Sequence, residues 1–191
     1  MRGTFFGLPF TLAPGRVFSP RPATELLVRA ALRQIDCGPR RVADVGTGSG
    51  AIAVTLAAHR PQLQVWATDT NPDSVELARK NAVENGVAER VRVLRSELLE
   101  GVPDRLDAVV ANLPYLPTSL RDARYDTEPA DAVYAPDDGL DPLRRLLAEC
   151  RERLASRGRL LIQFDREVLA ANWWQLEHLR ATLEHRRKEA A

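Results

Sequence analysis

The residues best suited to chemistry lie in the segment Asp107 to Tyr115, DAVVANLPY, where an apolar run stops at Asn112-Leu113-Pro114-Tyr115. Pro114 fixes its own φ and biases Leu113 away from helix, so the backbone carbonyls before it can point outward. The loop then presents the carboxamide of Asn112, one or two carbonyl acceptors and the ring of Tyr115. This set suits a planar amide or amidine nitrogen whose N–H groups need orientation. An ordinary turn after a core strand is the alternative interpretation.

A second candidate segment follows a short apolar strand at residues 41–45 and contains Gly46-Thr47-Gly48-Ser49-Gly50. An apolar helix at 51–58 comes directly after it. Because glycines let the backbone pass close to a ligand at a helix N-terminus, this order predicts a nucleotide-binding corner. It also fits the dinucleotide pattern, with ordinary turn glycines as a further alternative. The residues predicted here to bind a cofactor are Asp44, Gly46, Thr47, Gly48 and Gly50.

The strand after this helix, residues 64–68, ends in Asp69. An acid at this position is placed to accept both hydroxyls of a ribose, so we predict that Asp69 and its neighbour Thr70 bind the cofactor. Asn71-Pro72 already supplies the N-cap and first position of the next helix, which we expect to run to about Asn85 before Gly86.

Strands and helices continue to alternate along the chain, with strands predicted at 90–94, 107–111 and 159–164. This spacing predicts an α/β fold with a mainly parallel sheet of at least five strands and helices on both faces. Ligands in such sheets bind beyond the carboxyl ends of the strands. Ser96 and Glu97 follow one of these ends, and we predict that they contact an adenine edge, with a solvent loop as the alternative.

The segments outside this pattern suggest how the chain is organised. We expect one domain in three parts: a hairpin and helix at 1–40, a Rossmann-like core at 41–164 and a helix at 165–191. In the first helix Leu26, Leu27, Ala30 and Ala31 are predicted to share the inward face. The long polar segment 118–139 is predicted to be a lid or substrate loop. A helix that starts at Asp141 is expected to end at Gly158.

Composition narrows the function classes. The chain has 191 residues, 45% of them hydrophobic and 28% charged, with a net charge of +1, so strong overall basicity of the nucleic-acid-binding kind is absent. The two cysteines and three histidines have no metal-ligand spacing, so no metal is predicted. No apolar run reaches the roughly 20 residues that span a membrane. We predict a cytoplasmic protein without a membrane partner, and the sequence assigns no oligomeric state.

Five separated segments are GRVFSPRPATELL, VADVGTGSGAIAVTLA, WATDTNPDSVELARKNAVENG, DAVVANLPYLP and EPADAVYAPDDGLDPLRRLL. In this order they resemble the catalytic domain of the peptide-chain release factor glutamine N5-methyltransferase family. The resemblance implies a Rossmann-like enzyme that uses S-adenosyl-L-methionine, releases S-adenosyl-L-homocysteine and methylates the glutamine of a release factor's Gly-Gly-Gln loop. It places Gly46, Gly48 and Gly50 near the methionine portion and Asp69 on the ribose. It places Asn112, Leu113 and Tyr115 around the target amide. We predict that Pro114 belongs to the same catalytic loop and that Asn112 also contacts the cofactor.

The chemistry of an amide nitrogen agrees with this assignment, because its lone pair is delocalised and it needs help as a nucleophile. We hypothesise that the side-chain oxygen of Asn112 and the backbone carbonyl of Leu113 accept its two N–H bonds. Tyr115 would pack on the planar amide. No general base of tuned pKa is required, which fits the lack of histidine or cysteine near this motif.

Some positions depart from the family pattern. Leu113 stands where the family usually has a second proline, Ala23 where it usually has Glu, and Gln163-Phe164-Asp165 where it carries Glu-Ile-Gly. We expect no counterpart of the family's N-terminal helical domain and no closing antiparallel strands, which leaves an inactive cofactor-binding paralogue as an alternative. Since NLPY also resembles ribosomal RNA adenine dimethyltransferases, N6-adenine methylation of RNA or DNA is another. The last alternative function is that of a dinucleotide oxidoreductase.

Overall fold

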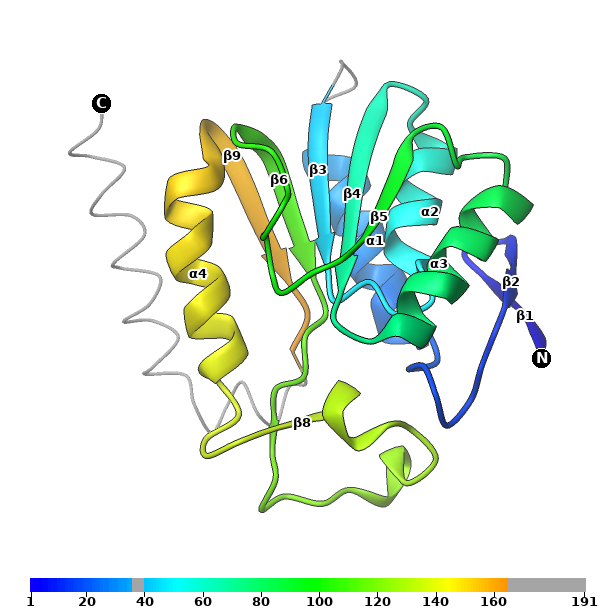
Figure 1. The fold of residues 1–191 in the computed structure, drawn as a ribbon, viewed down its shortest axis with the longest axis vertical. Helices are drawn as coiled ribbons and strands as arrows, with labels where there is room; N and C mark the ends of the chain where they lie inside the picture. The colour runs from blue at the N-terminus through cyan, green and yellow to red at the C-terminus, as the bar shows by residue number, and fades with distance from the viewer. Residues whose placement is uncertain (36–39, 165–191) are drawn as a thin grey trace.

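The computed structural model describes residues 1–35 and 40–164, and a sheet of five strands in the order β5-β4-β3-β6-β9 forms its centre (Figure 1). Every neighbouring pair in this sheet is parallel. The strands are β3 (Arg40–Val45), β4 (Leu63–Asp69), β5 (Val91–Arg95), β6 (Leu106–Ala111) and β9 (Leu154–Ile162). The structure confirms the predicted α/β fold. Because β3 pairs with both β4 and β6, the loops that follow these three strands meet at one edge.

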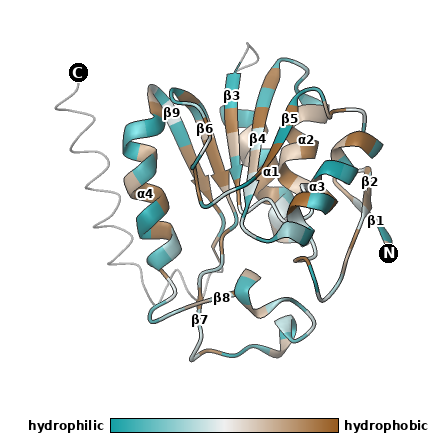
Figure 2. Cartoon of the chain, in the orientation of Figure 1, coloured by the Kyte–Doolittle hydropathy of each residue, from teal (hydrophilic) through white to brown (hydrophobic). Residues whose placement is uncertain are grey.

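The central strands are apolar on both faces, as parallel strands covered by helices must be. Val42 and Val110 pack into a core on one face, whereas Ala43 and Val109, which follow or precede them, pack into a second core on the other. All four side chains are buried. Each fully buried valine stabilises the fold by about 1.5–3 kcal/mol relative to an exposed one. Figure 2 shows the hydrophobic residues concentrated along these strands.

Helices cover both faces of the sheet, as predicted (Figure 1). The first core contains residues of α1 (Pro22–Gln34), α2 (Ala51–His59) and α3 (Pro72–Glu84). The second core contains residues of α4 (Asp141–Arg153) and of the segment that follows β5. Since α2 lies between the sheet and its neighbouring helices, its residues 51–57 are all buried.

The ends of α3 confirm the predicted capping residues. The side chain of Asn71 accepts a hydrogen bond from the Asp73 N–H at 2.8 Å, which satisfies one of the unpaired donors of the first turn. At the other end Gly86 has a φ of +67°. The Val87 N–H then donates to the carbonyl of Ala82 at 2.9 Å, in the manner of a Schellman motif.

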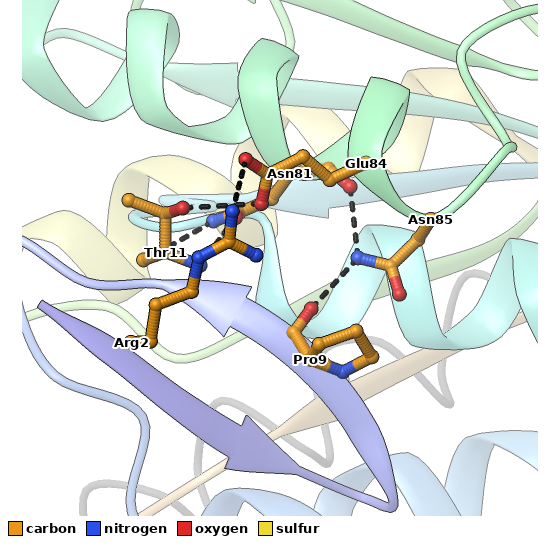
Figure 3. Close-up of polar contacts among 6 residues, drawn as sticks. All are labelled: Arg2, Pro9, Thr11, Asn81, Glu84 and Asn85. Atoms are coloured by element: carbon orange, nitrogen blue, oxygen red, sulfur yellow. Dashed lines mark hydrogen bonds and ion pairs between the residues drawn. The ribbon is translucent and has the colours of Figure 1, made fainter.

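The N-terminal hairpin is formed by β1 (Arg2–Phe5) and β2 (Leu8–Thr11), which pair antiparallel. Its two-residue turn, Phe6-Gly7, has φ values of 52° and 78°, the signs that a type I′ turn requires. Polar contacts attach this hairpin to α3 (Figure 3). The structure confirms a small N-terminal hairpin, although its second strand ends at Thr11.

The long polar segment after β6 has its own short elements. They are β7 (Leu116–Pro117), the 3-10 helices η1 (Ala123–Tyr125) and η2 (Ala130–Ala132), and β8 (Tyr134–Ala135), which pairs parallel with β7. This lobe lies beside the edge where the strands end (Figure 1). It is anchored at its end, where the Asp138 carboxylate accepts hydrogen bonds from the Leu140 N–H at 3.0 Å and from Arg144.

One predicted core residue and one predicted helix boundary were wrong. In α1, Leu26 is 67% exposed, and Val28 lies in the core instead. Helix α4 ends at Arg153 rather than at Gly158, because Leu154 already pairs with Leu106 at the start of β9. The next paired residue is Arg159, opposite Ala108, so residues 155–158 form a bulge.

The helix predicted at 165–191 lies outside the described residues, as does Asp165. Within the described ranges no helix is both long enough and apolar enough to span a membrane.

Candidate active site

The glycine turn lies between β3 and α2 and is fixed by the neighbouring strand. The N–H groups of Gly46 and Thr47 both donate to the carbonyl of Thr68 at 2.9 Å. Gly46 and Gly48 have φ values of +71° and +56°, which favour glycine. A Cβ at Gly46 would lie 2.9 Å from the side chain of Leu113, so glycine here also lets the NLPY loop approach the turn.

Asp69 connects this turn to the loop after β4. Its carboxylate accepts hydrogen bonds from the Gly48 N–H at 2.8 Å and from the Asn71 N–H at 2.9 Å. Burial raises the pKa of this carboxyl above its ordinary value, and these hydrogen bonds act in the opposite direction. The negative charge of Asp131, from η2, raises the pKa further. Each carboxylate oxygen has more than one lone pair, so Asp69 retains acceptor capacity for a ligand.

A cavity of about 220 Å³ opens at the edge where β3, β4 and β6 end. Its wall includes most of the residues predicted to bind a cofactor, and those residues are Gly46, Thr47, Gly48, Asp69, Thr70, Ser96, Glu97 and Asn112. Leu113 and Pro114 line it as well. The topology therefore brings together residues from four loops that are far apart in the sequence.

Asp44 and Gly50 do not line this cavity. Asp44 is fully buried and accepts hydrogen bonds from the Thr47 hydroxyl at 2.6 Å and the Ala53 N–H at 3.0 Å. Burial raises the pKa of its carboxyl to about 7. A Cβ at Gly50 would lie 3.1 Å from the Cα of Ala78, so this glycine allows α2 and α3 to pack closely. Both residues therefore support the glycine turn without lining the cavity.

A second cavity, of about 90 Å³, lies on the other side of Asn112 and Leu113. It shares these two residues, Phe18 and Ala132 with the larger cavity. Aromatic side chains line it: the Tyr115 ring lies 5.4 Å from that of Phe164, and Phe18 and Tyr125 complete the set. Asn112 and Leu113 thus lie at the junction between the larger cavity and the aromatic one.

The carboxamide of Asn112 makes no hydrogen bond to any residue in the described ranges. It is half-buried at the end of β6, where the Gln163 N–H pairs with the preceding carbonyl, of Ala111, at 3.0 Å. A polar group in such a position normally has a partner. The junction therefore offers an oriented acceptor and donor to a bound molecule.

Sequence reasoning missed Thr24, which is 3% exposed and lines the larger cavity. Its hydroxyl has no hydrogen-bond partner within the described part of the chain, and the same holds for the Ser96 hydroxyl. Thr24 belongs to the first turn of α1, and only the packing of α1 against α2 brings it to the glycine turn. Its place directly after Pro20-Arg21-Pro22-Ala23, at a helix start, was the available signal.

The polar lobe contributes to both cavities, and its role as a lid or substrate loop stays a prediction. Asp131 and Ala132 line the larger cavity, and Tyr125 and Val133 line the smaller one. Among residues 1–35 and 40–164, no group of three or more histidine, cysteine or acidic side chains is placed to hold a metal ion.

The parallel sheet, the glycine turn and the acid after β4 define a Rossmann-like methyltransferase fold. It is shared by the ribosomal protein L11 methylase from Lactobacillus delbrueckii subsp. bulgaricus, with a TM-score of 0.62 and 23% identity over 90% of this chain and 73% of that one. It is also shared by the precorrin 8W decarboxylase of Methanobacterium thermoautotrophicum, with a TM-score of 0.63 and 20% identity over 91% and 77%. At these identities the likeness concerns the fold alone.

Residues 11–124 match the family described as methyltransferase small domain, and the chain belongs to this family. Similar curated proteins are named release factor glutamine methyltransferase. That of Deinococcus radiodurans is 42% identical over 154 residues, which are 78% of this chain and 55% of that protein. That of Salmonella typhimurium is 36% identical over 185 residues, which are 93% and 62%. The chain therefore spans a little over half the length of these relatives.

Proposed function

We propose that this chain is an S-adenosyl-L-methionine-dependent methyltransferase that methylates the side-chain amide nitrogen of a glutamine in a protein, a peptide-chain release factor. The observation that carries the proposal is the carboxamide of Asn112, which has no partner in the described structure and lies where the two cavities meet. The larger cavity would hold the cofactor, and the smaller one would hold the glutamine side chain.

The residues of the larger cavity fit the cofactor. Asp69 keeps acceptor capacity for the ribose hydroxyls, and the two glycines of the turn leave room for close approach of the methionine portion. Thr24 and Ser96 line the same cavity, and each has a buried hydroxyl without a partner in the described part of the chain. When bound, S-adenosyl-L-methionine supplies an electrophilic methyl group on a positively charged sulfur.

Asn112 and Leu113 would orient the target nitrogen. The side-chain oxygen of Asn112 and the backbone carbonyl of Leu113 accept its two N–H bonds and turn its lone pair toward the methyl group. These two oxygens would stabilise the positive charge that grows on the nitrogen as it takes up the methyl group. The nitrogen then loses one proton to solvent. The Tyr115 ring would pack against the planar amide.

The substrate assignment rests on the relatives named release factor glutamine methyltransferase. Leu113 does not disturb it, because the backbone carbonyl at this position accepts a hydrogen bond whatever the side chain. We place this activity in the cytoplasm, where release factors act. The release factor is the proposed partner.

A labelling experiment tests this function against its alternatives. Purified chain and methyl-labelled S-adenosyl-L-methionine are added to a lysate depleted of its own methyltransferases, and protein, RNA and DNA are then separated. We expect label in a release factor, and its loss when the target glutamine is replaced. Label in RNA or DNA would instead establish N6-adenine methylation. Cofactor binding without any label would establish the inactive paralogue, and binding of NAD alone the oxidoreductase.

A further inference from the structure

A buried carboxylate lies next to the smaller cavity without lining it. The Glu128 side chain is 5% exposed, and its oxygens accept hydrogen bonds from Arg21 at 3.1 Å and from the Ser19 N–H at 3.0 Å. A buried carboxylate is stable only when it is paired in this way. Glu128 therefore compensates the charge of Arg21, across a long separation in sequence.

Arg21 is held flat beside the cavity that it lines. The centre of its guanidinium lies 5.6 Å from the Phe18 ring and 5.2 Å from the Tyr125 ring, and both rings line the same cavity. Its Nη2 also donates to the carbonyl of Arg124 at 3.2 Å. Its Nε, in contrast, is buried and has no hydrogen-bond partner among the residues that the structure describes.

Gln163 contributes an acceptor to the same cavity. Its side-chain oxygen is buried and has no hydrogen-bond partner in the described part of the chain. Arg21 and Gln163 both line this cavity, and each has a buried polar atom without a partner in the described part of the chain, beside the carboxamide of Asn112. Buried polar atoms without partners cost free energy, so these groups indicate a ligand that offers both an acceptor and a donor.

We infer that Arg21 and Glu128 form a charge-compensated recognition pair, which makes this cavity select a neutral carboxamide over a carboxylate. The inference rests on the proposed function and adds the basis of its choice between glutamine and glutamate. The Arg21 Nε–H donates to the carbonyl oxygen of the target, and the NH2 group of the target remains for Asn112 and Leu113.

Charge explains why a glutamate side chain would be rejected. With Glu128 in place, Arg21 offers a directed N–H but no net positive charge to attract an anion. A carboxylate also has no N–H to donate to the side-chain oxygen of Asn112 and the backbone carbonyl of Leu113, which the proposed function pairs with the NH2 group of the target. Selection by unmatched polar groups is stronger than selection by size alone.

The test compares two release factors, one with its target glutamine intact and one with glutamate in its place. Their affinities for the full chain loaded with S-adenosyl-L-homocysteine are measured by calorimetry. We expect Glu128→Gln to bring the ratio of the two affinities at least about tenfold toward glutamate, because Arg21 is then uncompensated. Arg21→Lys keeps the charge but loses Nε–H, and should weaken binding of the glutamine form about 10- to 100-fold.

Controls separate recognition from folding. Glu84→Gln removes a comparable partner of an ion pair, that with Arg2 at the hairpin, and should leave the affinity ratio unchanged. Affinity for S-adenosyl-L-homocysteine should be the same in all variants that fold. An unchanged ratio in Glu128→Gln, with wild-type methyl transfer intact, would overturn this inference alone. A wild-type chain that neither binds nor methylates the glutamine form would overturn the proposed function and the inference with it.

Discussion

Two asparagine side chains, Asn81 and Asn112, each lie where separate segments of the chain meet, and they differ in their hydrogen bonds. Asn81, on α3, is fully buried and makes three hydrogen bonds: it accepts from the Thr11 N–H at 2.8 Å and donates to the carbonyls of Thr11 at 3.0 Å and Ser49 at 2.8 Å. Asn112, after β6, is half-buried, and its carboxamide has no partner in the described ranges. The carboxamide of Asn81 therefore holds the hairpin and the glycine turn to α3, whereas the carboxamide of Asn112 is available to a ligand.

The surroundings of the two groups repeat this difference. At the hairpin, Glu84 accepts hydrogen bonds from Arg2 and Thr11, and Asn85 donates to the carbonyl of Pro9 at 2.9 Å (Figure 3). Around Asn112, by contrast, cavities open on both sides. Polar groups that satisfy one another specify structure, whereas oriented groups without partners specify binding.

Removal of the Asn112 carboxamide should have the largest effect on activity. Asn112→Ala should lower the rate of methyl transfer by about 10²–10³-fold or more, since it removes an acceptor for charge that develops in the transition state. Affinity for S-adenosyl-L-homocysteine and the unfolding midpoint should stay close to wild type. Radiolabel transfer, calorimetry and thermal unfolding measure the three quantities. Parallel loss of activity and cofactor affinity would assign Asn112 to the cofactor instead.

The converse change is Asn81→Ala. It leaves the N–H and carbonyl of Thr11 and the carbonyl of Ser49 without partners, so unfolding free energy should fall by roughly 2–4 kcal/mol. Urea denaturation measures this loss. At a temperature where the variant is folded, its turnover should remain within a few-fold of wild type. A stability equal to that of the wild type would show that the contact between the hairpin and α3 does not depend on this carboxamide.

The two acids near the glycine turn also differ: Asp69 lines the cavity, whereas Asp44 lies behind the turn. Burial raises the pKa of Asp44 to about 7 in the folded chain, so the folded state binds more protons than the unfolded state between about pH 4 and that value. Its contribution to stability is complete below that window and is lost as pH rises through it. The loss between about pH 5 and about pH 8 should be on the order of 2–3 kcal/mol.

Urea denaturation of wild type and Asp44→Asn at both pH values tests this expectation. The asparagine does not titrate, so the variant should lack this part of the fall in stability. An identical pH dependence in both proteins would mean that Asp44 is ionised in the folded state throughout.

The smallest expected effect concerns Gly50 and its control Gly86. Both have positive φ, +79° and +67°, but a Cβ at Gly50 would also meet Ala78 at 3.1 Å, whereas nothing lies within 4 Å at Gly86. Gly86→Ala should cost about 1 kcal/mol from backbone strain, and Gly50→Ala about 1 kcal/mol more from contact between α2 and α3. Thermal unfolding of both variants measures the difference. Equal losses would indicate that the helices shift without cost.

Much of the fold and of the site could be predicted because its signals are local. The apolar run before Asn112, the glycines after β3 and the acid after β4 each lie within a few residues of the element that positions them. Parallel pairing of β3 with β4 and β6 then brings them to one edge without further information.

The features that sequence reasoning missed depend on contacts between distant segments. Gly158 was expected to end a helix, but a Cβ there would lie 2.7 Å from the carbonyl of Leu106, so glycine is required where the bulge of β9 passes β6. Thr24 and the Arg21–Glu128 pair likewise acquire their roles only when α1 and the polar lobe are packed around the sheet. No short pattern in the sequence encodes such approaches.

A crystal structure of the chain with S-adenosyl-L-homocysteine and a peptide that contains Gly-Gly-Gln would show directly whether Asn112 and Leu113 orient the target amide. We predict the glutamine side chain in the smaller cavity, with its amide nitrogen about 3 Å from the side-chain oxygen of Asn112 and from the carbonyl of Leu113. A glutamine bound elsewhere, or an Asn112 carboxamide that pairs with the protein while the peptide is bound, would contradict the account.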